Sequence, residues 1–357
     1  MALPFLKDFK KKLDKMASVS LGLKPPGEWW STGNYALNKA LSGSFTRGIP
    51  VGRITGFCGP SGAGKSYISS NVMKYAQQAG AHIVIMDSEN AVDTEYLSKI
   101  GVDTSEDKLT YISVDTIEDV NAVMSDFFTG YEAAYKSDTK SAQKVLMVLD
   151  SIAMLSTTTE QENYNGSGEI KADQGIRSKR SKSMLRMILK KIAPWPIAFI
   201  TTDHVYPADI KLGQGPWAIT NSTRFSASII GLITSLRLKE DTEVVGVRMR
   251  FETYKSRFAK IGTKIELEVP YHSGMSPFSG LIELLESMNV LVKEGYSYAF
   301  DFEGEHIKFR EKDMNNDIVQ KLLKHPIILQ AESSGNEDSI ENFEAVESEI
   351  LEEYKEV

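Results

Sequence analysis

The sequence predicts an α/β fold with a mainly parallel central sheet. Short apolar runs alternate with helical segments along most of the chain, which is typical of a sheet covered by helices. A glycine-containing loop joins one of these runs to a helix, and two of the runs end in an acidic residue. The last runs follow one another closely, which indicates an antiparallel edge.

The composition is that of an ordinary globular protein. The chain has 357 residues, of which 41 are Lys or Arg and 48 are Asp or Glu, so its formal net charge is -7. These values exclude a disulfide-rich miniprotein or a fibrous chain, and the length allows two folded units or one large α/β unit with appendages. The single cysteine, Cys58, cannot form an internal disulfide, which favours a reducing compartment such as the cytoplasm. We expect no membrane span, because about 20 apolar residues are required, and no secretory signal.

The central elements are predicted in order from the apolar runs. Val51–Pro60 is expected to be a short strand that enters a turn. A helix begins at Lys65, because apolar residues including Ile68 and Val72 recur on one helical face. Further strands are predicted at His82–Asp87, Leu109–Val114, Val145–Asp150, Ile197–Thr202, Ile229–Leu238, Val244–Tyr254 and Lys264–Val269.

Two segments interrupt this pattern, and a small appendix follows it. Thr157–Gly175 and Tyr206–Thr223 are polar, contain glycine and have no regular period. Long loops inside a compact domain are usually functional or disordered. After Pro270 we expect a helix around Ser279–Ser287, short strands within Tyr296–Phe309 and a helix before Lys324.

Charge is distributed unevenly along the chain. Residues 331–357 carry ten acids and one base, so the other 330 residues have a net charge of +2. Such a tail either covers a cationic site or is simply solvated, and charge alone leaves both interpretations open.

One motif has the pattern of a phosphate-binding loop, GxxxxGK[ST], between an apparent strand and an apparent helix. It consists of Gly59, Pro60, Ser61, Gly62, Ala63, Gly64, Lys65 and Ser66. Its glycines allow backbone N–H groups to face an anion, and the helix N-terminus adds a partial positive charge. Lys65 is expected to reach the β and γ phosphates, and Ser66 to ligate Mg²⁺.

Hydrolysis also requires carboxylates beside this loop. Asp150 ends a buried run and is the candidate for the magnesium side of the site. Glu89 follows the strand that ends at Asp87 and is the best-placed group to orient and deprotonate a water. The alternatives are a strand-end acid that meets solvent for Asp150 and a solvated loop acid for Glu89.

These residues resemble the RecA-type strand-exchange ATPases. The resemblance rests on Leu37–Ser66, on the run Asp87–Tyr96, on the strand that ends at Asp150 and on Lys255-Ser-Arg257. It extends from about Asn34 to His325. Within the family the chain looks closest to phage UvsX-type recombinases, because of Asp203-His204 and Gly274–Leu281.

The resemblance assigns roles to individual residues. Glu89 matches the catalytic glutamate, and Tyr67, Asp93 and Tyr96 match nucleotide contacts, the last two at the adenine. Lys255 and Arg257 match paired cations that reach the γ-phosphate of a neighbouring subunit, so nucleotide binding and assembly are expected to be coupled. His204 matches a nucleotide sensor, whereas Asp203 departs from the asparagine expected before it.

The two irregular segments lie where the family binds DNA. Between Lys171 and Lys191 there are eight bases and one acid, and an apolar stripe at helical spacing runs through them. Such a surface suits a phosphate backbone, although a charged helix face is more often simply solvated. The candidate DNA contacts are Lys171, Arg177, Lys179, Lys211, Trp217 and Arg224. Trp217 either stacks on bases or packs under its own loop.

The leading hypothesis is therefore an ATP-dependent DNA recombinase that forms filaments on single-stranded DNA and exchanges strands with double-stranded DNA. Its implied cofactors are ATP and Mg²⁺, its partners are other copies of the chain and loader or single-strand-binding proteins, and its location is the bacterial cytoplasm. The alternatives are a hexameric helicase with a RecA core and a regulatory ATPase without a DNA function. We expect an N-terminal oligomerisation segment (1–33), a RecA-like P-loop ATPase core (34–270), a small C-terminal subdomain (271–330) and an acidic, disordered tail (331–357).

Overall fold

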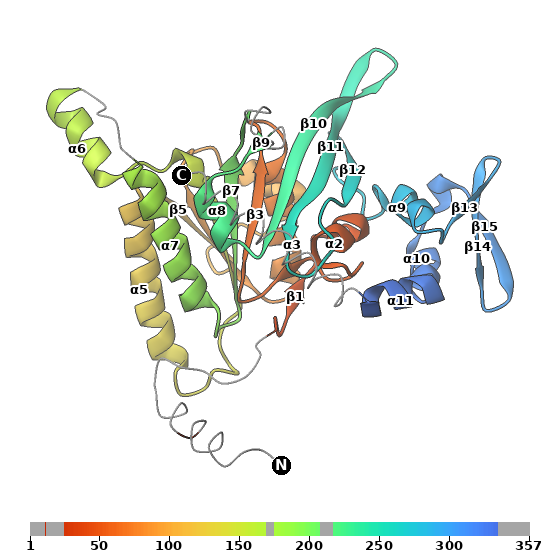
Figure 1. Cartoon of the computed structure of the whole chain (residues 1–357), viewed down its shortest axis with the longest axis horizontal. Coiled ribbons are helices and arrows are strands. Elements are labelled where there is room, and N and C mark those ends of the chain that lie inside the picture. The colour runs from red at the N-terminus through yellow and green to blue at the C-terminus, as the bar shows by residue number, and fades with distance from the viewer. Residues whose placement is uncertain (1–10, 12–24, 169–174, 208–216, 335–357) are drawn as a thin grey trace, which may run out of the picture.

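The computed structural model describes residues 11, 25–168, 175–207 and 217–334, and an eight-stranded sheet lies at its centre (Figure 1). The strand order is β12-β11-β10-β3-β7-β6-β4-β5. The strands are β3 (Ile54–Gly59), β4 (His82–Asp87), β5 (Leu109–Ser113), β6 (Val145–Asp150), β7 (Ile197–His204), β10 (Ile229–Glu240), β11 (Glu243–Ser256) and β12 (Lys264–Pro270). The six strands from β10 to β5 are parallel, and β11 and β12 are antiparallel to their neighbours. The predicted α/β class and its antiparallel edge are therefore confirmed.

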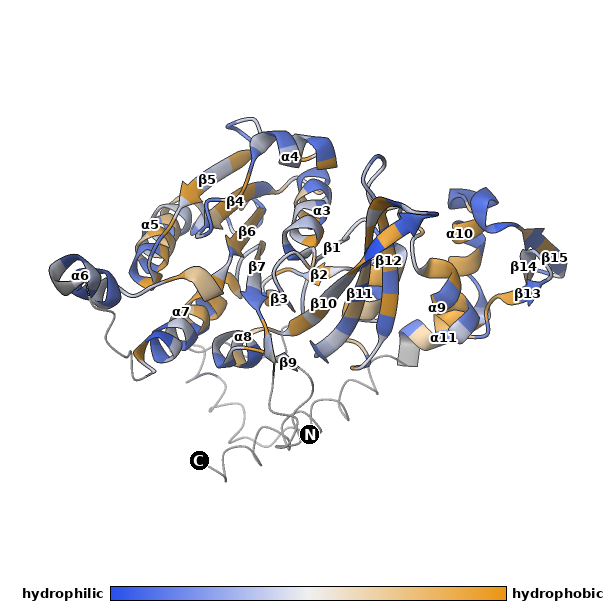
Figure 2. Ribbon diagram, turned by 90° about the horizontal axis from the view of Figure 1, so that it is seen from above, coloured by the Kyte–Doolittle hydropathy of each residue, from blue (hydrophilic) through white to orange (hydrophobic). Residues whose placement is uncertain are grey.

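Helices cover both faces of this sheet. On one face lie α2 (Tyr35–Ser42) and α3 (Lys65–Gln78), and on the other lie α5 (Ile117–Tyr135) and α7 (Ile176–Ile192). The short helix α4 (Thr94–Ile100) follows β4. Apolar residues of the helices turn toward the sheet (Figure 2). Because the parallel strands are buried on both faces, they consist of the nearly continuous apolar runs seen in the sequence.

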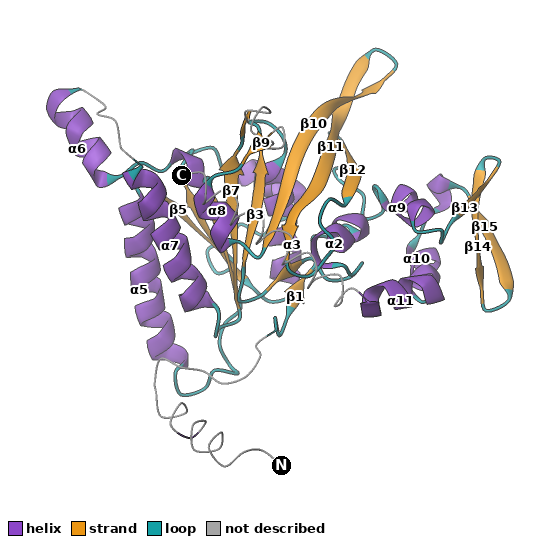
Figure 3. Ribbon diagram, viewed as in Figure 1, coloured by secondary structure: helices purple, strands orange, loops and turns teal. Residues whose placement is uncertain are grey.

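The β10–β11 hairpin extends beyond the rest of the sheet (Figure 3). Both strands are longer than their apolar runs predicted. β10 continues to Glu240, and β11 begins at Glu243. Their outer parts are exposed, and β11 also forms ion pairs with β12, such as Arg248–Glu268, with Nη2 2.6 Å from Oε1. The hairpin end contains Lys239, Glu240 and Glu243, and such charged residues hide the end of a strand from a search for apolar runs.

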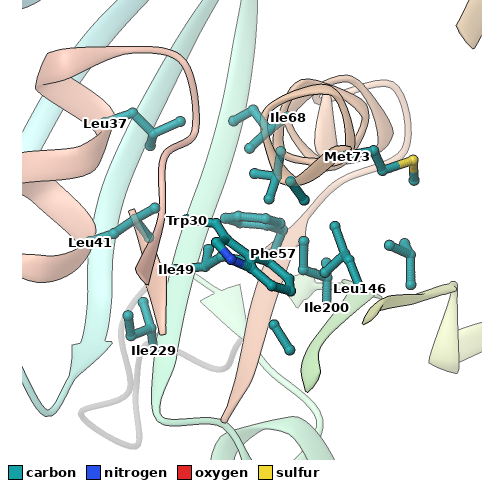
Figure 4. Packing of buried hydrophobic residues seen from close by; sticks show 14 of the residues in the cluster. Trp30, Leu37, Leu41, Ile49, Phe57, Ile68, Met73, Leu146, Ile200 and Ile229 are labelled. Atoms are coloured by element: carbon teal, nitrogen blue, oxygen red, sulfur yellow. The ribbon is translucent and has the colours of Figure 1, made fainter. Parts of the chain in front are cut away.

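The N-terminal part of the described chain belongs to the ATPase core. β1 (Trp29–Trp30) pairs with β2 (Ile49–Pro50), and Trp30 is only 1% exposed. Figure 4 shows the indole among Ile49, Phe57 and Ile200. The sequence predicted that residues 1–33 form a segment apart from the core, but Trp30 of this segment is part of the core. Residues 1–10 and 12–24 lie outside the described residues.

The C-terminal subdomain has its own apolar cluster. It contains α9 (Leu281–Ser287), β13 (Val292–Glu294), β14 (Ser297–Phe302), β15 (Glu305–Phe309), α10 (Asn316–Leu323) and α11 (Pro326–Ser334). Phe45 from the core is buried in this cluster, and the Phe45 N–H donates to Glu332 Oε1 at 3.0 Å. The fold therefore continues to Ser334, whereas the sequence placed the start of the acidic tail at 331. Residues 335–357 are not among those described.

The two irregular segments contain elements that the sequence did not predict. In the first, α6 (Thr158–Ser167) begins with a capping box in which Thr157 and Glu160 bond reciprocally. Its residues are polar on all sides, so no apolar period marks it. In the second, β8 (Tyr206–Pro207) pairs with β9 (Trp217–Ala218), and α8 (Asn221–Ser226) follows. These elements are too short to produce a period. None of the helices that the structure describes is long and apolar enough to cross a membrane.

Candidate ATP site and DNA-facing elements

The phosphate loop lies between β3 and α3, as its motif predicts. Gly62 and Gly64 have positive φ values of 72° and 97°, which favour glycine. A Cβ on Gly59 would lie 2.2 Å from the Ile233 carbonyl oxygen, and one on Gly64 would lie 2.3 Å from Met249 Sδ. The β10–β11 hairpin therefore packs directly against the loop. Gly62 has nothing within 4 Å of such a Cβ, so the opposite side of the loop is open.

Lys65 is held inside this loop. Its Nζ donates to the carbonyl oxygens of Gly59 and Pro60, at 3.0 and 2.9 Å. Burial lowers the pKa of Lys65, while the nearby carboxylates of Asp150 and Glu89 act in the opposite direction. The ammonium group is thus held by weak neutral acceptors that a phosphate can replace.

Asp150 connects the loop to the ends of the neighbouring strands. Its Oδ2 accepts from Ser66 Oγ at 2.6 Å, and its Oδ1 accepts from Thr202 Oγ1. Burial raises the pKa of Asp150, and the two hydroxyl bonds partly offset this effect. The predicted metal pair, Ser66 and Asp150, is thus brought together. Thr202 was not predicted, because a threonine inside an apolar run carries no signal of its own.

Glu89 faces the same space and is fixed by two side chains. Its Oε1 accepts from Ser151 Oγ at 2.7 Å and lies 3.1 Å from His204 Nε2. Glu89 and His204 come from the ends of β4 and β7, on either side of β6. The predicted catalytic glutamate and the predicted sensor are therefore in direct contact. The sequence gives no signal for the role of Ser151 as a donor to Glu89, because the two residues are far apart in the chain.

Asp87 holds the loop that carries Glu89. It is 1% exposed and accepts the backbone N–H groups of Glu89, Ala91 and Val92 at 2.8 to 3.0 Å. Tyr111 donates its hydroxyl to the same carboxylate at 3.1 Å. The sequence marked Asp87 only as the end of a strand. A buried strand-end acid followed by a polar turn is the signal that could have identified this role.

A pocket opens beside these groups, and its lining includes Ser66, Ser70, Glu89, Tyr96 and Asp150. Burial raises the pKa of Tyr96 to about 12, with Tyr67 and Asp150 nearby. The other two predicted nucleotide contacts have structural partners. Asp93 caps α4 by accepting the Glu95 N–H, and Tyr67 accepts the Met275 N–H at 2.8 Å.

The residues present fit a magnesium–nucleotide complex. Among the described residues no group of three or more His, Cys, Asp or Glu could hold a metal by itself. Mg²⁺ in nucleotide sites is bound by one or two protein oxygens together with phosphates and waters. The Ser66 hydroxyl beside the Asp150 carboxylate, next to the open side of a glycine loop, provides this donor set.

Lys255 and Arg257 lie away from the phosphate loop of their own chain. Lys255 pairs with Ile230, and Ile230 pairs with Gly56, three residues before Gly59. This offset is about 10 Å along the strands, with β10 in between. Lys255 is 9% exposed and donates to the Arg224 carbonyl oxygen at 2.7 Å. Burial, and then repulsion by Arg257 and Arg224, lower the pKa of Lys255 to about 8.

The candidate DNA contacts are placed unequally. Arg177 and Lys179 are exposed in the first turn of α7, and Arg224 is half-buried in α8. Trp217 is half-buried and packs against the apolar core. Lys171 and Lys211 lie outside the described residues.

Comparison with known proteins identifies the family. A family model described as the RecA N-terminal domain matches residues 4–276. The protein RecA of Streptomyces avermitilis is 27% identical over 303 residues, which cover 83% of this chain and 74% of the relative. RecA proteins of Frankia casuarinae and Paenarthrobacter aurescens are also 27% identical, over 83% of this chain and 81% of each relative.

These matches cover the phosphate loop, both irregular segments and the strand of Lys255. The predicted recombinase function is confirmed at the level of the family, in preference to a helicase or a regulatory ATPase. The family's proteins are DNA-dependent ATPases that couple hydrolysis to strand exchange. The chain therefore belongs to the RecA family and is a RecA-type DNA recombinase.

Proposed function

We propose that this chain binds ATP with Mg²⁺ beside Lys65 and hydrolyses it while assembled as a helical filament on single-stranded DNA. The observation that carries the proposal is that the ends of β4 and β6 line one pocket, and that the end of β7 contacts the pocket residue Glu89. Glu89 and His204 meet at 3.1 Å, and the Ser66–Asp150 pair lies in the same pocket. Groups that would hold a phosphate, a metal and a water thus share one space.

The proposed chemistry divides among these side chains. Lys65 exchanges its two carbonyl acceptors for phosphate oxygens. Ser66 and Asp150 would hold Mg²⁺, which neutralises charge on the phosphates when bound. Glu89 accepts a proton from the attacking water, and Ser151 keeps its carboxylate in position through Oε1. His204 contacts the same carboxylate from the end of β7 and would sense the nucleotide through it.

Lys255 and Arg257 complete the site of a neighbouring copy in this proposal. Lys255 lies about 10 Å along the strands from the level of its own phosphate loop, beyond β10, and Arg257 lies further away. A head-to-tail interface that does not close on itself generates a helical filament. Residues 1–33 and the subdomain from 271 onward are proposed to contribute to this assembly around the core at 34–270.

Single-stranded DNA is proposed to bind beside α7 and α8. Arg177 and Lys179 start α7, directly after the first irregular segment, and Arg224 lies in α8 after the second. Cationic groups in this position bind phosphates without reading sequence. Double-stranded DNA would enter the same filament for pairing, and the acidic residues of 331–357 would compete with DNA for these bases. Loader and single-strand-binding proteins are the further partners of this proposal.

The closer likeness to phage UvsX-type recombinases is part of the same proposal. It is supported by Asp203-His204 at the end of β7 and by Gly274–Leu281. In this second run Met275 donates its N–H to Tyr67 of α3, so the run lies beside the nucleotide helix. A phage origin would place the chain in a bacterial host cytoplasm, in agreement with the single buried thiol of Cys58.

The proposal is tested by ATP turnover with and without single-stranded DNA, together with electron microscopy of the same samples. We expect DNA to stimulate turnover and helical filaments to form. Lys65→Ala should abolish both, because the phosphates lose their cation, whereas Lys74→Ala on the same helix should retain them. Turnover that is indifferent to DNA, with rings or monomers, would contradict the proposal.

A further inference from the structure

Asp203 is a buried acid whose two carboxylate oxygens differ in their hydrogen bonds. It is 0% exposed. Its Oδ2 accepts from the hydroxyls of Thr220 and Thr223, the second at 2.8 Å. Its Oδ1 is buried and has no hydrogen-bond partner among the described residues. Burial raises the pKa of Asp203. An apolar residue would cost less free energy at this position, so the acid has a reason other than packing.

The partners of Asp203 lie at the start of α8. Thr220 is the N-cap residue of this helix, and Thr223 is in its first turn. We call these two hydroxyl bonds to Asp203 the Asp203 clamp. Because α8 has only six residues, its own helical bonds do little to fix it, and external contacts determine its position.

On one side the clamp is joined to the nucleotide pocket. His204 follows Asp203 in β7 and contacts Glu89 at 3.1 Å. The same strand end is paired with β3, where Asp203 lies opposite Cys58 and His204 lies opposite Gly59. A shift of His204 against Glu89 therefore reaches the clamp through a single peptide unit.

On the other side α8 contacts two cations, the proposed interface residue Lys255 and Lys182 of α7. The Arg224 carbonyl oxygen accepts from Lys255 Nζ at 2.7 Å. Lys182 of α7 lies over the Phe225 ring, 4.1 Å from its centroid. β9, which contains Trp217, ends two residues before Thr220. One short helix thus contacts the proposed interface lysine and α7, and it begins shortly after β9, which contains Trp217.

We propose that Asp203 is a positioning residue whose clamp on Thr220 and Thr223 transmits the nucleotide state from His204 to α8, and from there to Lys255 and Trp217. This inference rests on the proposed function, because it describes the regulation of the same site. Two oxygen–hydroxyl bonds to one buried carboxylate give the helix a single defined position, and loss of either bond leaves α8 free to turn.

The test uses the full chain labelled with 5-fluorotryptophan. The fluorine signal of Trp217 is identified by its loss in Trp217→Phe, and spectra are recorded with and without ATPγS and Mg²⁺. We expect nucleotide to shift this signal in the unmodified chain. In Thr223→Val the shift should be lost, while the nucleotide dissociation constant changes by less than about threefold.

Three further variants complete the test. Thr55→Val is the matched change, because Thr55 is also buried in this sheet but its hydroxyl has no hydrogen-bond partner among the described residues. Asp203→Asn keeps an oxygen that accepts from both threonines, so it should restore the shift that Asp203→Ala abolishes. A difference between these two folded variants would show that the shift depends on the two hydroxyl bonds and not on the charge of Asp203.

The outcomes separate the inference from the proposed function. An unchanged Trp217 shift in Thr223→Val overturns the inference, as does an absent shift in an unmodified chain that binds nucleotide and hydrolyses it with DNA. Both of these leave the proposed function intact. If the unmodified chain binds no nucleotide, both proposals fail. If Thr223→Val does not fold, the comparison of Asp203→Asn with Asp203→Ala decides.

Discussion

Lys255 shows at the scale of a residue how the fold adjusts a charge. It is buried at the end of β11, and it shares its surroundings with Arg257 and Arg224. Burial and these two cations lower the pKa of Lys255 to about 8. The ammonium form is thus largely present at neutral pH, and it is lost as the pH rises through 8. A neighbouring phosphate would stabilise that form.

We therefore predict an alkaline limit for nucleotide-dependent assembly. Assembly with ATPγS and single-stranded DNA should decrease as the pH rises through about 8, because the proposed interface cation loses its proton. In Lys255→Arg this decrease should move far upward, since a guanidinium stays charged throughout that range. Light scattering between about pH 6.5 and 9.5 measures the effect. The same decrease in Lys255→Arg would assign it to another group.

The motif residues of the site could be predicted, but the residues that hold them could not. Lys65 and Ser66 follow from a fixed spacing, and Asp150 follows from its place after an apolar run. Ser151 and Asp87 act through bonds to Glu89 and to the N–H groups of its loop. Those bonds depend on how separate strand ends meet, which no local pattern contains.

At the scale of elements, α7 has an apolar face against the sheet and basic residues that differ in their surroundings. Met184, Leu185 and Ile188 are buried against the sheet, as the apolar stripe predicted. Several bases of the same helix already have partners. Arg180 Nη1 lies 2.5 Å from Glu118, and Lys191 Nζ lies 2.8 Å from Glu132. The prediction from sequence treated all eight bases of this region as equivalent, because the sequence does not show which of them face α5.

We predict that DNA affinity depends on the first turn of α7. Arg177→Ala and Lys179→Ala should each weaken binding of single-stranded DNA at low salt. Each should also reduce the slope of log K against log salt by about 0.7, the value for one phosphate contact on a single strand. Lys191→Ala is the control, because it removes a base from the last turn of the same helix, far from Arg177 and Lys179. Fluorescence anisotropy over a salt series gives the slopes. If the slopes of all three variants equal that of the unmodified chain, the first turn of α7 does not contact DNA.

Whole strands were easier to predict than short helices. β4 and β6 have the predicted bounds, since both are buried on two faces and end at a charge. α6 was missed because it is polar all round, and α8 because six residues do not establish a period. The spacing of Thr157 and Glu160 fits a capping box, and this is the signal that could have identified α6.

At the scale of the whole molecule, the candidate site is divided. Glu89, Lys65 and Asp150 meet at the ends of the parallel strands. Lys255 lies about 10 Å back along the sheet, beyond β10. If Lys255 acts on ATP, it acts on the ATP of another copy. A site that is complete only between two copies makes turnover a report of assembly.

This central claim is tested most directly by mixing two inactive variants. Glu89→Gln removes the base but keeps Lys255, and should lower turnover about 10² to 10⁴-fold. Lys255→Met keeps Glu89 and the packed aliphatic stem but removes the cation. In a randomly mixed filament with equal parts, about a quarter of the interfaces join an intact Glu89 to an intact Lys255.

We therefore predict that the equal mixture recovers about a quarter of the unmodified DNA-stimulated turnover, although each variant alone is nearly inactive. Mixing Glu89→Gln with Lys65→Ala serves as the control, because both changes fall in the same half of the site and the Lys65→Ala protomer contributes no nucleotide. Turnover of the first mixture that equals the mean of its two separate components would contradict a site shared between copies.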